Sequence, residues 1–139
     1  MFRTIGADLN MNILLAGNNS VYSGMEVVIY SLMKYNRNIN LYILTSSFEQ
    51  IPTPDDNIIR CYEGLNIQQK EKIISILKYF DPKNSKVEFI DPIHLYRNLL
   101  EGGKNEWTGF TPYASFRLLA DLLLPEADDV LYLDCDTVI

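Results

Sequence analysis

Apolar runs and amphipathic stretches alternate along the chain, and their order predicts the fold. Short apolar or alternating runs, typical of strands in a buried sheet, lie at residues 11–16, 41–45, 86–90 and 130–133. Helical spacing of apolar residues covers residues 24–35, 67–80 and 112–124, and a shorter helix is expected at 93–100. This alternation predicts an α/β fold with a mostly parallel, Rossmann-like sheet flanked by helices.

Polar residues mark where the predicted helices begin. Ser23 and Glu26 have the spacing of a capping box, and Asn66 is a good N-cap for the second helix. Thr111 followed by Pro112 is typical of the start of a third helix. Between the first two helices, two prolines predict irregular structure at 46–64, with a short extended piece at 58–62.

The last apolar run carries the strongest chemical signal. Four apolar residues predict a strand buried on both faces, and Asp134 and Asp136 follow it directly. On an extended backbone, alternate residues point to the same side, so both carboxylates would meet at the carboxyl end of the strand. A hard divalent cation with a phosphate ligand would suit such a pair, whereas a single Asp there is more often a turn or cap residue. Cys135 is expected to face the other way, as a small buried hydrophobe.

A loop and an arginine provide further candidates. The turn at 17–20 joins a strand to a helix, where free backbone N–H groups can hold a nucleotide, although Asn18 suits a plain turn equally well. Arg117 interrupts an apolar helix face and would either pair with Asp121 or point at an anionic ligand. The single histidine, His94, lacks a partner motif and is expected to be structural.

Composition narrows the function classes. With 139 residues, 47% apolar and 22% charged, the chain suits one globular domain at 11–139 after a flexible lead-in at 1–10. A net charge of −6 argues against a nucleic-acid partner. No apolar stretch is long enough for a transmembrane segment and no signal-peptide pattern is present, so a cytoplasmic location is expected. Two cysteines without ligand spacing indicate neither a metal cluster nor a disulfide framework.

Several segments in the same order resemble the family 8 glycosyltransferases. Residues 12–20 resemble that family's first strand and nucleotide loop, and residues 113–119 resemble its helix bearing an arginine. Residues 124–126 and 129–138 resemble the run into its Asp-x-Asp metal motif. The resemblance extends from about residue 11 to the last residue, and its final segment is the most specific part.

The resemblance implies a GT-A fold and metal-dependent, retaining transfer of a hexosyl group from a UDP-sugar to a saccharide or lipopolysaccharide-type acceptor. It implies that Asp134 and Asp136 hold Mn²⁺ or Mg²⁺ against the diphosphate. It places the uridine near Ala16, Asn18 and Tyr22, although family members often carry acidic residues in that loop. Arg117 matches the family's arginine and would lie near the diphosphate or the donor sugar.

The family also uses a His-x-x-Gly-x-Lys-Pro-Trp segment, which this sequence lacks. The catalytic residues are therefore expected beyond the last residue. The chain is expected to be the donor-side portion of a GT-A domain, truncated after the Asp-x-Asp strand, with little or no transferase activity alone. Sustained transfer from a UDP-sugar with Mn²⁺ would refute this expectation.

Two other functions stay open on the sequence. Haloacid-dehalogenase-like phosphatases also place an Asp-x-Asp after a buried strand, with the first Asp as nucleophile and Mg²⁺ as cofactor. A non-catalytic module that binds a nucleotide sugar is the third interpretation. Metal-dependent binding of UDP would favour the glycosyltransferase half-site, and phosphatase activity lost on Asp134→Asn would favour the phosphatase.

Overall fold

A parallel four-stranded sheet lies at the centre of the computed structural model, which describes residues 10–50, 57–101 and 111–137. Its strands are β1 (Met11–Ala16), β2 (Ile39–Leu44), β5 (Lys86–Ile90) and β6 (Leu131–Tyr132), in the spatial order β5-β2-β1-β6. The chain thus builds outward from β1 to β5 and then returns to place β6 on the other side of β1. This is the doubly wound order of Rossmann-like sheets, with the reversal between β1 and β6. The predicted α/β class with a parallel sheet is confirmed.

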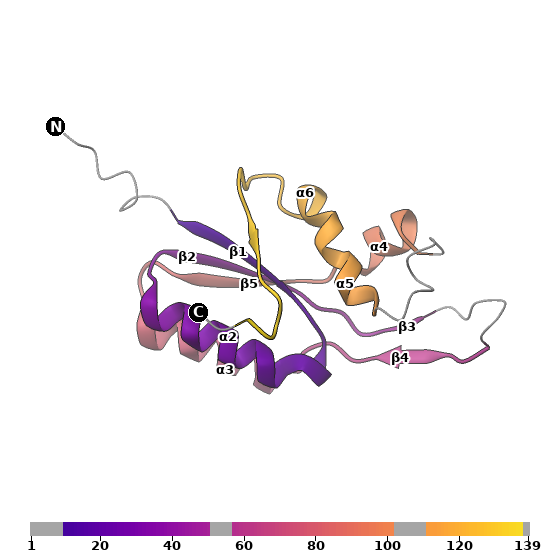
Figure 1. The fold of residues 1–139 in the computed structure, drawn as a ribbon, viewed down its shortest axis with the longest axis horizontal. Helices are drawn as coiled ribbons and strands as arrows, with labels where there is room; N and C mark the ends of the chain where they lie inside the picture. Colours follow the sequence, from indigo (N-terminus) through magenta and orange to yellow (C-terminus); the bar gives the residue numbers. More distant parts are fainter. Residues whose placement is uncertain (1–9, 51–56, 102–110, 138–139) are drawn as a thin grey trace.

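Two layers of helices cover the sheet (Figure 1). α2 (Tyr22–Tyr35) and α3 (Ile67–Phe80) pack on one face, and α4 (Ile93–Leu99), α5 (Pro112–Phe116) and α6 (Ala120–Leu123) lie on the other. Alternate residues of β1 enter the two cores: Ile13 and Leu15 join the α2–α3 core, while Leu14 and Ala16 join the opposite core. The predicted helices and strands therefore occur in the predicted order, and both faces of β1 are buried.

The start of α2 differs from the prediction. A short 3₁₀ turn, η1 (Asn19–Val21), runs directly into α2, so the helix begins at Tyr22 rather than Gly24. Val21 occupies the N-cap position and provides no side-chain hydrogen bond. The Ser23–Glu26 capping box is therefore wrong, because Ser23 already lies inside the helix. The Asn66 cap of α3 is confirmed, and Asn66 forms a reciprocal capping box with Gln69.

The third predicted helix is interrupted. Residues 112–123 form α5, then a 3₁₀ turn η3 (Arg117–Leu119), then α6. In a 3₁₀ turn, residues three apart lie on the same side. Phe116 and Leu119 can therefore both be buried against the sheet, while Arg117 and Leu118 face solvent.

The strand before the two aspartates is shorter and more exposed than predicted. β6 comprises only Leu131 and Tyr132, and it pairs with β1 along one edge. Leu131 is 52% exposed, and β6 lies at the edge of the sheet with a partner strand on one side. The prediction of a strand buried on both faces is therefore wrong.

Two short antiparallel strands form a hairpin, of which the sequence predicted only the second. β4 (Arg60–Tyr62) matches the expected extended piece, but β3 (Phe48–Gln50) lies in a region expected to be irregular. Three residues are too few to show a strand period in the sequence. Cross-strand packing defines the pair instead: the rings of Phe48 and Tyr62 lie 5.2 Å apart.

Side-chain amides tie the amino-terminal ends of the strands together. Asn10 donates to the Asn40 side chain (2.9 Å) and the Asn84 carbonyl (3.3 Å), and Asn40 donates to the Asn12 side chain (3.1 Å). Asn12 in turn donates to the carbonyl of Asp129, just before β6 (3.0 Å). The predicted flexible lead-in otherwise lies outside the described residues.

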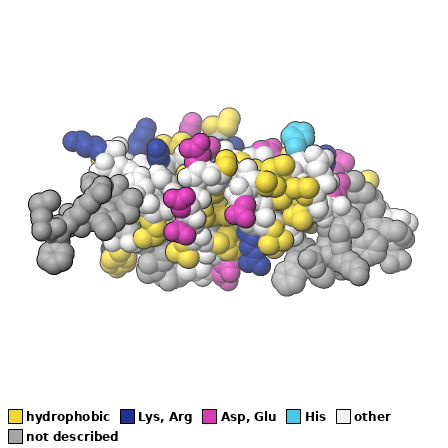
Figure 2. Space-filling view, turned by 90° about the horizontal axis from the view of Figure 1, so that it is seen from above, with side chains coloured by type: hydrophobic (Ala, Val, Ile, Leu, Met, Phe, Trp, Pro, Cys, Tyr) yellow, Lys and Arg dark blue, Asp and Glu magenta, His cyan; other side chains and the backbone are white. Residues whose placement is uncertain are grey.

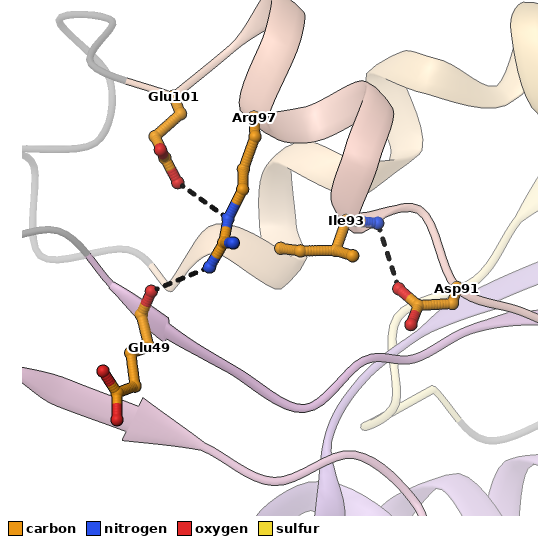
Figure 3. Close-up of polar contacts among 5 residues, drawn as sticks. All are labelled: Glu49, Asp91, Ile93, Arg97 and Glu101. Atoms are coloured by element: carbon orange, nitrogen blue, oxygen red, sulfur yellow. Dashed lines mark hydrogen bonds and ion pairs between the residues drawn. The ribbon is translucent and has the colours of Figure 1, made fainter.

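Polar contacts fasten α4 beside the hairpin (Figure 3). The guanidinium of Arg97 donates to the Glu49 carbonyl at 3.3 Å and lies 3.5 Å from the Glu101 carboxylate. Asp91 accepts a hydrogen bond from the Ile93 N–H, which satisfies one of the free donors of the first helical turn. These contacts fix the layer that carries one wall of the cavity described below.

A buried carboxylate closes the link between α3 and β2, and it should make stability depend on pH. Asp81 accepts hydrogen bonds from the Asn38 N–H (2.8 Å) and the Ser85 hydroxyl (2.7 Å). Burial raises the pKa of Asp81, but these hydrogen bonds and the nearby Arg37 charge outweigh burial and hold the pKa below its ordinary value. The ionised form is therefore favoured by folding, and its contribution is present above about pH 4 and is lost as the pH falls through the native pKa.

We expect Asp81→Asn to lower the free energy of unfolding by about 2 kcal/mol near neutral pH. The deficit should shrink at about pH 3, because the wild-type carboxylate is then losing its charge as well. Urea unfolding at both pH values measures this, with the exposed Asp121→Asn as a control. An equal deficit at both pH values would contradict the role of the charge.

Candidate functional site

A cavity of about 520 Å³ opens at the carboxyl ends of β1 and β6, where the strand order reverses. Open α/β sheets bind their ligands at this position, because the loops there diverge. Three segments contribute its lining: residues 16–24 after β1, residues 111–114 at the start of α5, and residues 132–136 after β6. The two sequence segments with the strongest chemical signal therefore meet at one place.

Four of the six predicted site residues meet at this cavity. Ala16 and Asn18 line it from the β1–α2 loop, and Asp134 and Asp136 line it from the opposite side. Both carboxylates are exposed at the surface. The sequence predicted that both residues continue an extended strand. They lie instead in a turn, in which the Thr137 N–H donates to the Asp134 carbonyl (3.0 Å). The turn nevertheless keeps both beside the cavity.

Tyr22 and Arg117 are not among the residues that line the cavity. Tyr22 packs against the α2–α3 core, where burial and then the Glu26 charge raise its pKa to about 12. Arg117 lies over the ring of Tyr132, with its guanidinium carbon 5.3 Å from the ring centroid, and it makes no ion pair with Asp121 among the described residues. Tyr132 itself lines the cavity, so Arg117 lies behind one of the walls.

Two neighbouring asparagines of the β1–α2 loop point in different directions, one into the cavity and one toward α3. Asn18 lines the cavity, and its side-chain oxygen accepts a hydrogen bond from Ser20 (2.7 Å). Asn19 is tied away from the cavity, because its side-chain oxygen accepts from Gln69 of α3 (2.8 Å). The amide of Asn18 is therefore the loop side chain best placed to contact a ligand.

Aromatic residues form a wall that sequence reasoning missed. Tyr113 is buried, and its hydroxyl donates to the Ser46 carbonyl, so its ring serves as a fixed wall. Burial, then the charge and hydrogen bond of Asp134, raise the pKa of Tyr132 to about 12. Tyr132 thus stays protonated near neutral pH and can orient the Asp134 carboxylate. The packing of α5 against β1, which no sequence pattern records, brings Tyr113 to the cavity.

Cys135 faces away from the carboxylates toward the α2–α3 core, as predicted, although it is half-buried rather than fully buried. Its thiol lies 3.4 Å from the Ala16 carbonyl. Burial, followed by the charges of Asp134 and Asp136, raises its pKa to about 11. The thiol is therefore not activated as a nucleophile.

The other titratable candidates lie away from the cavity. His94 is exposed on α4, and Figure 2 shows the histidine side chain on the molecular surface. Among the described residues, no group of three or more His, Cys, Asp or Glu side chains could hold a metal ion. Asp134 and Asp136 both line the cavity, and carboxylate oxygens are the ligand type that a Mg²⁺-like ion prefers.

The fold and the cavity define an α/β protein with a doubly wound, Rossmann-like sheet and, at its switch point, a mainly apolar cavity that carries two carboxylates. No protein-family model, curated protein or solved structure matches the chain. In the described part of the chain, no helix has the length and apolar character needed to cross a membrane.

Proposed function

We propose that the cavity is the donor site of a metal-dependent glycosyltransferase of the family 8 type with a GT-A fold, and that it binds a UDP-sugar. The observation that carries the proposal is the meeting of the β1–α2 loop with Asp134 and Asp136 around one cavity at the switch point. A cavity of about 520 Å³ also falls within the range typical of small-molecule sites.

The electrostatics of the cavity explain why a cation would be required. A diphosphate placed beside Asp134 and Asp136 would be repelled, by about 4 kcal/mol per pair of unit charges 4 Å apart at the effective dielectric of a protein surface. Arg117 is separated from the cavity by Tyr132 and does not offset both carboxylates directly. Asp134 and Asp136 would hold Mn²⁺ or Mg²⁺, which supplies Lewis-acid stabilisation of the leaving diphosphate.

The remaining lining residues suit a nucleoside. The Asn18 amide can bond to a base or ribose, and the ring of Tyr113 offers an apolar wall. Tyr132 lines the cavity beside Asp134. In this arrangement the nucleoside lies along the β1–α2 loop, and the diphosphate lies beside the aspartates. The acceptor, on this proposal, is a saccharide or lipopolysaccharide.

Calorimetric titration with UDP tests the proposal. We expect UDP to bind in the presence of Mn²⁺ and to bind far more weakly after EDTA treatment, because the carboxylates then repel the diphosphate. UMP should depend less on Mn²⁺, since it lacks the second phosphate. Absence of UDP binding under both conditions would refute the proposal. Hydrolysis of p-nitrophenyl phosphate that is lost in Asp134→Asn would favour the phosphatase interpretation instead.

A further inference from the structure

The turn that carries the two aspartates has few backbone attachments of its own. Among the described residues, β6 pairs with β1 at two positions, the Leu133 N–H donates to the Leu14 carbonyl (3.0 Å), and the turn itself is closed by the hydrogen bond from the Thr137 N–H to the Asp134 carbonyl. A short edge strand and a single turn do not determine where two repelling carboxylates lie. Other contacts must therefore hold the turn in place.

Gly24, in the first turn of α2, provides one such contact. A Cβ atom at this position would overlap the carbonyl oxygen of Cys135 and lie 3.4 Å from its carbonyl carbon. The backbone of the turn therefore rests directly on the helix backbone, an approach that only glycine permits. Glycine at a helical position is less favourable than alanine by about 1 kcal/mol, so helix stability alone does not account for this residue.

The side chain of Cys135 provides the second contact, on the side opposite the carboxylates. Its thiol lies 3.4 Å from the carbonyl oxygen of Ala16, the last residue of β1. A Cβ atom on Gly17 would lie 3.4 Å from the same sulfur. Cys135 therefore links the turn to the beginning of the β1–α2 loop.

We infer that Gly24 and Cys135 are positioning residues that clamp the Asp134–Asp136 turn to the β1–α2 loop and so set the two carboxylates against the nucleotide side of the cavity. Gly24 supports the turn through its backbone, and Cys135 joins it to Ala16. The inference deepens the proposed function, because it names what aligns the two halves of the donor site. The clamp itself can be tested without any ligand.

The reactivity of the Cys135 thiol reports whether the turn is clamped. Cys61 is exposed on the hairpin, so a Cys61→Ala background leaves Cys135 as the thiol that a water-soluble aromatic disulfide can label. In that background we expect Gly24→Ala to increase the labelling rate at least about 10-fold, which corresponds to a free-energy change of about 1.4 kcal/mol. Ser23→Ala, at the exposed neighbouring position of α2, is the matched control and should label at the parent rate.

The metal-dependent part of ligand binding provides a second measurement, because Gly24 and Cys135 also line the cavity and a direct contact would change binding with and without the metal alike. Gly24→Ala should weaken binding of UDP with Mn²⁺ by about 10-fold and should weaken binding of UMP in EDTA by a smaller factor, because Gly24 itself lines the cavity but the metal-dependent part of binding needs the aligned carboxylates. Cys135→Ala should weaken it in the same way, and Cys135→Ser should restore part of the loss, because a serine hydroxyl can still donate to Ala16. Thermal unfolding checks that each variant is folded, and alanine at position 24 should itself favour the helix.

Each outcome decides something. If Gly24→Ala labels and binds like the Ser23→Ala control, the clamp is refuted. If labelling accelerates but the parent protein binds no UDP with Mn²⁺, the clamp is supported and the proposed donor site is refuted. If both labelling and metal-dependent binding change as expected, Gly24 and Cys135 position the carboxylates for the ligand.

Discussion

Phe116→Ala is expected to lower the free energy of unfolding by about 3–5 kcal/mol, the range for removing a fully buried aromatic side chain. Phe116 is 0% exposed, and its ring lies 5.0 Å from that of Tyr113 and 5.3 Å from that of Tyr96, both in edge-to-face geometry. A small domain has only about 5–15 kcal/mol of total stability, so this loss would leave the variant close to unfolding.

The matched control for this prediction lies two residues along the same segment. Leu118 is 63% exposed on the 3₁₀ turn, so Leu118→Ala should cost little. Urea unfolding followed by circular dichroism measures both variants. A loss below about 1 kcal/mol for Phe116→Ala would mean that the α4–α5 layer does not depend on its aromatic core.

The same aromatic core also supports the cavity. Tyr113 packs against the ring of Phe116 and also forms part of the cavity wall. A cavity left by the missing phenyl ring would free Tyr113 to move. Phe116→Ala should therefore weaken ligand binding as well as stability, and the two effects can be separated by measuring binding well below the unfolding temperature.

The elements found from the sequence are those whose own residues determine them. β1 and β2 are rich enough in apolar residues to identify buried strands, β5 shows the alternation of a half-buried strand, and Asn66 marks the start of α3. β3 was not predicted, and β6 was predicted to be longer than it is. The length of each strand depends on where its partner strand pairs with it. The switch to a 3₁₀ turn at Arg117 depends on packing against the sheet, which no local pattern records.

The candidate site divides in the same way. The carboxylate pair and the β1–α2 loop were found because strand ends in a parallel sheet meet at one edge, which follows from topology alone. Gly24 and Tyr113 could not be found in that way, because their importance arises from contacts with residues far along the chain. For Arg117 the sequence left open a pair with Asp121 or an anionic ligand, and its contact with the Tyr132 ring could not be predicted because it joins residues of different elements.

Removing either carboxylate should have the largest effect on ligand binding. We expect Asp134→Asn and Asp136→Asn each to weaken binding of UDP with Mn²⁺ by at least about 100-fold, or about 2.7 kcal/mol. Both carboxylates line the cavity, and within the described residues no third acidic, histidine or cysteine side chain forms a metal group with them, so on the proposed function each carboxylate would be essential. An amide in place of one carboxylate removes a charge that a divalent cation requires.

The effect on stability should have the opposite sign, which separates a functional role from a structural one. Asp134 and Asp136 are exposed and carry like charges beside each other in a chain of net charge −6. Replacing one carboxylate relieves repulsion, so the free energy of unfolding without metal should stay the same or rise slightly. Asp128→Asn is the matched control, because it removes the same charge from an exposed position before β6. Calorimetry with UDP and Mn²⁺, together with urea unfolding, would reject the metal-binding role if the two site variants bound UDP as tightly as Asp128→Asn does.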